Sequence, residues 1–511
     1  MNINFKIGLS KNNLPIIEPF EINNETIAIQ SAYSPDREAE RIINNVDFSD
    51  KEIIIILGLG LGYYLAALSK KKLQNKKIIV IEKFAEIYNL FLQHKDKIFR
   101  QNNCDFEILI NPNEHELMTV FSQYINFKNF FKIKIIENHN LMKLDINFYH
   151  FVLKSLQKYL EFTQSNLLTT SKFGEEWILN SFENLRYYKD NYNFPILKKY
   201  CADKPALIVS AGPSLEKNIQ LLKKFKDNFF VFCVDTAANA LISNNIIPDF
   251  ICAIDSQIEN YKLLENIENP NIYLITTLIV NPNIPKKFNT QFYFNTKQPV
   301  DSLLEKFGYS ANFVKSGGSV ATSLFSIVRE IYCNPIIFIG QDLSFTNLYT
   351  HTKLSNKFLN IYKSLNKFTT FETLFFNENI GQIYETDIFG KRVFTSKSLL
   401  DFCRWFELEF TNPGYNCRYI NASGAGILKN NIEIIDFEKV CSEICSKKIS
   451  KHILLENEQK LISDNNFQNL IKKLNNDFAK LLNIENLLNK TNLQNLMNCC
   501  LSHFKNNYLK K

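Results

Sequence analysis

Glycine is scarce in this chain, with only 15 among 511 residues, whereas an average protein has about 7%. The 11 cysteines include no CxxC pair, which argues against a zinc site or a disulfide framework. No apolar run approaches the roughly 20 residues that cross a bilayer, and the opening MNINFKIGLSKNN has no apolar signal core. We therefore expect a cytoplasmic protein with no membrane span.

The chain also has no segment in which charge of one sign is strongly concentrated. The net charge is +7, and lysine-rich stretches such as 70–72 and 447–451 lack interleaved aromatic residues, which predicts a solvated surface rather than a nucleic-acid site. The 45% hydrophobic and 22% charged residues are typical of a globular protein. A mildly basic protein can still concentrate an anionic nucleotide donor.

The few glycines that remain are clustered. Glycine resists replacement where φ is positive or where the backbone must approach a ligand closely, so the clusters point to tight turns or binding loops. Nine of the 15 fall in five short places: Gly58, Gly60 and Gly62; Gly212; Gly317 and Gly318; Gly340; and Gly424 and Gly426.

The N-terminal region predicts a strand, a glycine turn, a helix and a second strand that ends in an acid. The apolar run 53–57 is followed by Gly58-x-Gly60-x-Gly62, and the second strand ends at Glu82. This pattern resembles a nucleotide or S-adenosylmethionine loop. Tyr63 stands where a third glycine would be, however, so a structural Rossmann-like unit without a ligand is the alternative.

A second series of apolar strands is predicted at 206–210, 229–235, 248–255, 272–277, 291–294 and 334–342. Polar residues recur just past the ends of these strands, where open parallel sheets have their ligand crevice. We predict an α/β protein of two Rossmann-like domains, at 1–160 and 161–446, with the second preceded by a helical segment. Residues 447–511 predict a C-terminal helical region.

Two predicted helix starts in the second domain suit an anion. Gly212 permits a tight turn after its strand, Pro213 pre-sets φ, and Ser214 can cap the helix while neighbouring N–H groups point at a phosphate. Ser316, Gly317, Gly318 and Ser319 repeat this design at a later helix, and their hydroxyls suit phosphate or ribose. A well-capped helix without a ligand is the alternative for each.

Three carboxylates and one histidine complete the candidate site. Asp235, Asp255 and Asp342 each follow an apolar strand and can accept from ribose hydroxyls or a base amine. No DxD pair occurs at these positions, so no metal-dependent sugar-nucleotide site is predicted. His351, nine residues beyond Asp342, is a candidate general base, and Tyr349 in the same loop can donate to a departing phosphate.

The segments SAGPSLEKN, VDTAANALISNNIIPDFICAIDS, KSGGSVATSLFSI and IIFIGQDLSFTNLYTH resemble, in this order, the central domain of the bacterial motility accessory factors. These are flagellin glycosyltransferases, and their domain is shared with archaeal 6-hydroxymethylpterin diphosphokinase-like proteins. The resemblance covers roughly residues 200–360. The AGPSL segment is also similar to the GNGPSL loop of small bacterial sialyltransferases, which implies a sialyltransferase-like, GT-A-like central domain.

The resemblance implies transfer of a nonulosonic acid of the pseudaminic or legionaminic type from its CMP donor to Ser or Thr hydroxyls of flagellin. The transfer would occur in the cytoplasm, support flagellum assembly and motility, and use no cofactor beyond the CMP-sugar. Two departures concern the chemistry: Ala211 replaces a polar loop residue, and Thr395 and Ser396 stand where the sialyltransferases have a base histidine.

Three alternatives remain open at this point. A pterin diphosphokinase-like transfer would use ATP and Mg²⁺, but the chain has no P-loop lysine motif. A non-catalytic factor could support motility by binding flagellin alone. A methyltransferase built on Gly58–Gly62 is the third.

Overall fold

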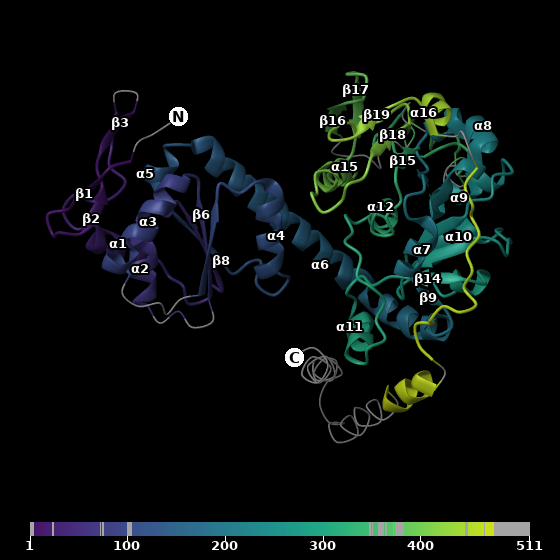
Figure 1. Cartoon of the computed structure of the whole chain (residues 1–511), viewed down its shortest axis with the longest axis horizontal. Coiled ribbons are helices and arrows are strands. Elements are labelled where there is room, and N and C mark those ends of the chain that lie inside the picture. The colour runs from purple at the N-terminus through teal and green to yellow at the C-terminus, as the bar shows by residue number, and fades with distance from the viewer. Residues whose placement is uncertain are drawn as a thin grey trace. The chain divides into compact units, whose positions relative to one another are not determined.

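The computed structural model divides into two compact units, Met1–Lys172 and Phe173–Lys511, which are shown in Figure 1. It describes residues 5–474 apart from 23–24, 72, 74–75, 100–104, 347–348, 350, 356–361, 363–364, 371, 374–382, 445–447 and 464; the side chains of 165–166 are also not described. The division lies within α6 (Ile146–Tyr188). None of the helices in these described ranges is long and apolar enough to cross a membrane.

Unit 1 is built on a four-stranded parallel sheet with strand order β7-β6-β5-β8. Two short antiparallel hairpins, β1–β2 and β3–β4, precede this sheet. The elements are β1 (Ile7–Leu9), β2 (Pro15–Ile17), β3 (Phe20–Ile22), β4 (Glu25–Ile27), α1 (Pro35–Asn44), β5 (Ile53–Leu57), α2 (Tyr63–Ser69), β6 (Lys77–Glu82), α3 (Ala85–Ile98), β7 (Asp105–Ile110), α4 (Glu114–Tyr124), β8 (Ile133–Glu137) and α5 (His139–Met142).

Strand β5 is central in this sheet because its side chains are apolar on both faces. All five residues are buried. Ile54 and Ile56 pack in a core that includes residues of α1, α2 and α3, whereas Ile53 and Ile55 pack with residues of α4 and the first half of α6. A continuous apolar run is what a strand covered on both faces requires, and the predicted strand 53–57 is confirmed.

Unit 2 contains a nine-stranded, fully parallel sheet with the order β19-β18-β15-β10-β11-β12-β13-β14-β9. Its elements are β9 (Tyr192–Asn193), α7 (Lys198–Cys201), β10 (Ala206–Val209), α8 (Leu215–Phe225), β11 (Phe230–Val234), α9 (Asp235–Ile242), β12 (Phe250–Ala253), α10 (Ile258–Leu264), β13 (Tyr273–Thr276), β14 (Gln291–Tyr293), α11 (Pro299–Lys306), α12 (Val320–Glu330), β15 (Ile336–Ile339), β16 (Ile383–Thr386), β17 (Arg392–Thr395), α15 (Lys397–Phe410), β18 (Tyr419–Asn421), β19 (Glu433–Ile434) and α16 (Phe437–Ile444), with short 3₁₀ turns between some of them.

Helices cover both faces of this sheet. Helices α8, α9 and α10 lie on one face, and α12 and α15 lie on the other (Figure 1). After the edge strand β9, the chain forms β10 in the middle of the sheet, moves outward through β11 to β14 beside β9, and then returns to place β15 on the other side of β10. The order in which strands are added to the sheet therefore reverses between β10 and β15. Open α/β sheets bind ligands at this reversal of strand order.

The predicted α/β fold with parallel sheets is confirmed, and each predicted strand of the second domain is present within one to three residues of its predicted ends. The predicted helical segment before it is α6. Its Asn180 and Asn184 donate to backbone carbonyls, among them those of Ile279 and Val280, so this face packs on the loop after β13. In the predicted C-terminal region, residues 465–474 are helical, and residues 475–511 lie outside the described residues.

Candidate functional site

The polar residues predicted at the strand ends lie along one edge of the unit 2 sheet. Strands β15, β10, β11 and β12 are consecutive neighbours. Asp342 follows β15, Ser214 follows β10, Asp235 follows β11 directly, and Asp255 follows β12. Because parallel strands end at the same edge, these four residues come from adjacent loops around the reversal between β10 and β15.

Asp342 lies inside the loop that follows β10. Its Oδ2 accepts a hydrogen bond from the Ser214 backbone N–H at 3.1 Å and from the Thr346 hydroxyl at 2.8 Å, and its Oδ1 accepts from the Ser214 hydroxyl. The side chain is 2% exposed. Burial raises the pKa of Asp342 above its usual range, against the opposing effect of the Ser214 and Thr346 hydrogen bonds.

This geometry corrects the predicted role of Gly212, Pro213 and Ser214. The N–H of Gly212 donates to Gly340 O at 2.8 Å, and both donors of Ser214 are bound to Asp342. The prediction that these groups point at a phosphate is therefore wrong, because a carboxylate of the chain already occupies the start of α8. Ser214 also makes no side-chain cap on α8.

Two of the scarce glycines permit this close approach of β10 and β15. A Cβ on Gly212 would overlap Gly340 O and the Asp342 carboxylate, and a Cβ on Gly340 would overlap Ser210 O. Gly340 also has a φ of +69°, which L side chains rarely adopt. The glycines are explained here by contact between two backbone segments.

The side-chain amide of Asn260 hydrogen-bonds to both Asp235 and Asp255. Asn260 Nδ2 in α10 donates to Asp255 Oδ2 at 2.9 Å and, more weakly, to Asp235 Oδ2 at 3.4 Å. Asp235 is 2% exposed and also accepts from the Thr236 N–H, whereas Asp255 is exposed. Asp255 is thus the carboxylate of this pair that a ligand can reach.

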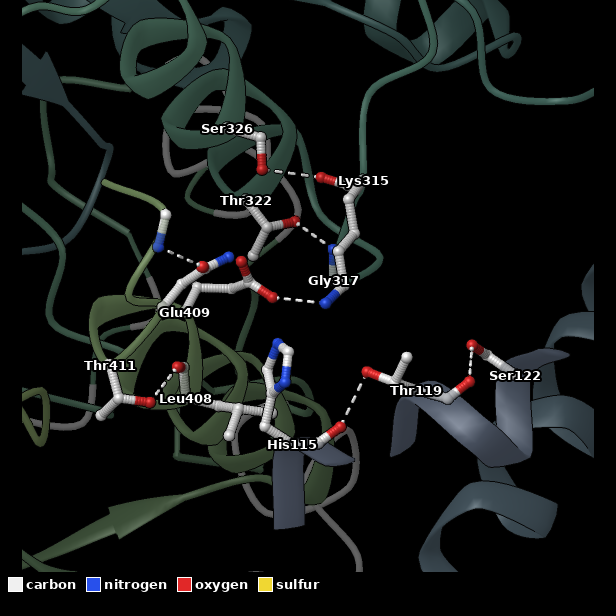
Figure 2. Close-up of polar contacts among 12 residues, drawn as sticks. His115, Thr119, Ser122, Lys315, Gly317, Thr322, Ser326, Leu408, Glu409 and Thr411 are labelled. Atoms are coloured by element: carbon white, nitrogen blue, oxygen red, sulfur yellow. Dashed lines mark hydrogen bonds and ion pairs between the residues drawn. The ribbon is translucent and has the colours of Figure 1, made fainter. Parts of the chain in front are cut away.

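The start of α12 is held by its own side chains, as Figure 2 shows for part of the network. Ser319 accepts from Thr322 N at 3.2 Å and caps the helix, which was the alternative to the predicted binding of phosphate or ribose by its hydroxyl. The Thr322 hydroxyl oxygen accepts from the N–H of Gly317 at 3.0 Å and of Ser319 at 3.1 Å, and Gly318 N–H donates to Ser316 Oγ at 3.1 Å. The backbone donors predicted for a phosphate are therefore used internally here too.

The hydroxyl of Ser316 differs from these backbone groups. Its oxygen accepts from Gly318 N–H and from the Ser323 hydroxyl at 2.8 Å, and it lies 3.4 Å from Thr322 Oγ1. Ser316 is half-buried. Because the two lone pairs are engaged and the Thr322 proton goes to Ser319 O, the Ser316 proton faces Thr322 Oγ1 at 3.4 Å, and a ligand would have to compete for it.

Sequence reasoning missed an ion-pair network beside this loop. Lys315 Nζ lies 2.6 Å from Glu409 Oε1 (Figure 2), and Arg329 lies 2.8 Å from Glu409 Oε2. Burial alone would raise the pKa of Glu409, but Lys315 and Arg329 hold it below its usual range. Lys315 is half-exposed and brings a cation to the loop; its position directly before Ser316 was the signal available in the sequence.

The loop with His351 is fixed to the same edge. Thr352 N–H donates to Ala211 O at 2.7 Å, and the Thr352 hydroxyl donates to Glu216 at 3.1 Å. Tyr349 forms an isolated bridge with Thr346, whose hydroxyl binds Asp342. His351 and Tyr349 are therefore one to three residues from anchors in the Ala211 and Asp342 segments. Residues 347, 348 and 350 lie outside the described residues.

The position expected for a base in the sialyltransferases has a structural role in this chain. The Thr395 hydroxyl is fully buried and donates to Leu343 O at 2.8 Å, and Ser396 caps α15 by accepting from Leu399 N–H. These two residues therefore support the Asp342 segment and the helix behind it.

In unit 1, the glycine loop after β5 also surrounds a carboxylate of the chain, that of Glu82. Glu82, fully buried at the end of β6, accepts from the N–H of Leu59 at 2.8 Å and of Phe84 at 3.0 Å, and more weakly from Gly60 at 3.4 Å. Burial raises the pKa of Glu82 to about 7, against the effect of these backbone hydrogen bonds. The loop's donors thus bind a carboxylate of the chain.

Comparison with known proteins agrees with the arrangement in unit 2. Residues 179–348 match the family described as 6-hydroxymethylpterin diphosphokinase MptE-like. These residues form an MptE-like domain. The domain spans β9 to β15 and includes Ser214, Asp235, Asp255, Ser316 and Asp342, whereas Tyr349 and His351 lie just beyond it.

Among solved structures, the MAf glycosyltransferase of Magnetospirillum magneticum AMB-1 has the same fold beyond the MptE-like domain. The match has a TM-score of 0.52 with 15% identity and covers 88% of this chain and 72% of that protein. The resemblance stated from the sequence is confirmed for the central domain and the fold.

Two proteins of Treponema pallidum (strain Nichols), each described as an uncharacterized protein, are also similar. One is 22% identical over 345 residues, which cover 66% of this chain and 59% of the relative. The other is 36% identical over 89 residues, which cover 17% and 41%. The chain thus spans less than two thirds of either relative.

Proposed function

We propose that this protein is a glycosyltransferase that transfers a nonulosonic acid of the pseudaminic or legionaminic type from a CMP donor to Ser or Thr hydroxyls of flagellin, in the cytoplasm before export. The observation that carries the proposal is the row of polar loops at the reversal of the unit 2 sheet. The fold shared with the MAf glycosyltransferase supports it.

The donor's phosphate binds beside the start of α12. Lys315 supplies an ammonium group and Ser316 a hydroxyl proton, while the internal hydrogen bonds of Thr322 keep the loop in place. A loop that is already ordered loses little entropy when it binds an anion. The donor's ribose hydroxyls or cytosine amine bind Asp255, which Asn260 orients.

His351 removes the proton of the acceptor hydroxyl, and Tyr349 donates to the leaving phosphate. Asp342 is a positioning residue, since its carboxylate binds Ser214 and Thr346 and so fixes the segment that leads to Tyr349 and His351. Substitution at the sugar's ketosidic carbon passes through an oxocarbenium-like state. The bond from that carbon to the CMP oxygen breaks, and the bond to the acceptor oxygen forms.

The leaving CMP carries the charge that the site must stabilise. Each fixed donor aimed at that charge contributes on the order of 3 kcal/mol to lowering the barrier. In this arrangement protein groups stabilise the phosphate, so we expect transfer to continue in excess EDTA.

The experiment is an intact-mass measurement of purified flagellin incubated with the full chain and a CMP-nonulosonate, with and without EDTA. We expect sugar-sized mass increments in both cases. His351→Ala should lower the rate by about a hundredfold or more, as expected for loss of a general base, while leaving CMP affinity unchanged. His452→Ala is the matched control, because this exposed histidine of unit 2 lies outside the site. Near-normal transfer by His351→Ala would remove it as the base.

A second candidate function is favoured by the match of residues 179–348 to the MptE-like family. Its description names 6-hydroxymethylpterin diphosphokinase, so the chain would transfer diphosphate from ATP to a hydroxymethylpterin. Incubation with ATP, Mg²⁺ and 6-hydroxymethylpterin separates the two, because AMP release without flagellin modification would favour this candidate. Flagellin capture without either reaction would identify a non-catalytic binding factor.

A further inference from the structure

Unit 1 contains a cavity of about 210 Å³ next to the predicted glycine loop. It is lined by Leu59–Leu61 after β5, by Asn138–Asn140 after β8, and by residues of α1. In the unit 1 sheet, with order β7-β6-β5-β8, the order in which strands are added reverses between β5 and β8. The cavity therefore lies at the position where open α/β sheets take a ligand.

One polar group of the cavity wall is unsatisfied. Gln30 lines the cavity and is 9% exposed, and within the described residues its buried Nε2 has no hydrogen-bond partner. Leaving such a donor unpaired costs about 1–3 kcal/mol. An acceptor atom on a bound molecule would satisfy it.

The charge of the lining selects against phosphate. Glu38 is the acidic residue of the lining, and no Lys or Arg is among the described residues that form it. Two backbone donors of the glycine loop, the N–H groups of Leu59 and Gly60, are bound to Glu82, and that of Gly62 donates to Leu59 O. A phosphate here would meet the Glu38 carboxylate with no lysine or arginine to offset it, and His139 of the lining has its Nδ1 3.3 Å from Glu137 Oε2. A neutral group with donor hydrogens avoids this repulsion.

The size and the remaining walls suit a flat heterocycle. A cavity of about 150 Å³ holds benzene and pockets for drug-sized ligands begin near 300 Å³, so this cavity lies between the two. Tyr64 and Leu61 supply aromatic and apolar surface. Glu38 Oε2 accepts from Ser31 N–H at 2.7 Å, and a carboxylate retains further acceptor sites for a ring amine.

We propose that this cavity binds the base of a nucleoside, with the base accepting from Gln30 Nε2 and donating to Glu38, and with no site for a 5′-phosphate. The ligand is thus a free nucleoside or a nucleoside carrying an uncharged or cationic substituent. This binding site is separate from the CMP-sugar site of unit 2 and does not depend on the proposed transfer.

The test is calorimetric titration of the full chain with adenosine, guanosine, cytidine and uridine, in the presence of excess CMP so that the unit 2 site is saturated. At least one nucleoside should bind with a Kd below about 1 mM. Its 5′-monophosphate should bind at least about tenfold more weakly, because of the like charge on Glu38. S-adenosylhomocysteine, run as a further arm, identifies whether the 5′ substituent adds affinity.

Gln30→Leu should weaken the nucleoside about tenfold or more, as expected for loss of a buried donor. Gln157→Leu, the same change at an exposed glutamine of α6, should have no effect. Glu38→Gln should narrow the difference between nucleoside and monophosphate, which keeps the test valid if Gln30→Leu fails to fold.

Absence of nucleoside binding, equal affinity for the monophosphate, or unchanged affinity in Gln30→Leu would each overturn the proposal. If CMP fails to bind unit 2, the loss of nucleoside affinity in Gln30→Leu still assigns the binding to the cavity of unit 1, so the two proposals fail independently.

Discussion

Both units have a parallel sheet whose strand order reverses beside one central strand, β5 in unit 1 and β10 in unit 2, but they differ in which carboxylate occupies the loop after that strand. In unit 1, Glu82 comes from β6, the strand that follows β5 in sequence, and the crevice between β5 and β8 is left as a cavity. In unit 2, Asp342 comes from β15, across the reversal itself, and fills the start of the crevice.

This difference shows that a glycine-rich loop after a strand does not by itself identify a phosphate site. In both units, a buried acid accepts from backbone donors of the loop, Glu82 from Leu59 and Gly60 and Asp342 from Ser214, while carbonyl groups of the chain accept from others such as Gly212. The proposed CMP site of unit 2 therefore uses the neighbouring loops, at Ser316 and Asp255, and the proposed nucleoside site of unit 1 lies on the opposite side of β5 from Glu82.

The largest expected effect is on stability, and it comes from a substitution that breaks the backbone contact between the segments after β10 and β15 in unit 2. Gly340→Ala should lower the free energy of unfolding of that unit by about 4 kcal/mol, because overlap with Ser210 O adds to the strain of a positive φ. Gly60→Ala in unit 1 should cost only about 1 kcal/mol, because the nearest atom to its Cβ is 3.6 Å away. Denaturant titrations of both variants measure the contrast.

Gly308→Ala is the control for strain alone, since Gly308 has a φ of +75° with open space around it. Equal losses for Gly340→Ala and Gly308→Ala would mean that the close approach of β10 and β15 contributes nothing.

A somewhat smaller effect concerns pH and unit 1. The pKa of Glu82 is raised from 4.5 to about 7 by burial, so the folded chain binds more protons than the unfolded chain between these values. The free energy of unfolding should therefore fall by about 3 kcal/mol as pH rises from 4.5 to above 7. Chemical unfolding at several pH values measures this slope.

The reference for that slope is Glu82→Gln, which keeps the shape of the side chain and cannot titrate. Subtracting its pH profile isolates Glu82 from the other groups. A difference that is flat, or that rises with pH, would show that Glu82 is ionised in the folded protein throughout this range.

The smallest effects separate a structural hydroxyl from a ligand-binding one in unit 2. Ser214→Ala should cost about 2 kcal/mol of stability, because Asp342 loses a buried donor, and CMP affinity should stay the same. Ser316→Ala should lower CMP affinity about tenfold and cost about 1 kcal/mol of stability, because the Gly318 N–H and the Ser323 hydroxyl lose an acceptor. Thermal unfolding measures the stability of the two variants, and calorimetry measures their CMP affinity. Loss of CMP affinity in Ser214→Ala but not in Ser316→Ala would show that Ser214 binds the phosphate.

The strands, and the sheet edge at which their carboxyl ends meet, could be predicted from the sequence. Buried parallel strands consist of continuous apolar runs, such as IIIIL at 53–57. The two N-terminal hairpins were not predicted, because their strands have only three residues each. The order of the polar loops along the edge followed from the topology.

The hydrogen-bond partners inside the site could not be predicted in this way. Ser214 and Asp342 are 128 residues apart, and Lys315 and Glu409 are 94 apart. No local pattern states that such groups meet, so the free backbone donors expected at both helix starts proved to be engaged. The Ser319 cap was predictable because its partner, Thr322, is three residues away.

A crystal structure of the full chain with CMP tests the central claim most directly. We predict CMP at the edge of the unit 2 sheet, with its phosphate within hydrogen-bond distance of Ser316 Oγ and Lys315 Nζ, its ribose or base at Asp255, and Asp342 still bound to Ser214. A phosphate bound to Ser214 with Asp342 displaced, or CMP found only in the cavity of unit 1, would contradict the account.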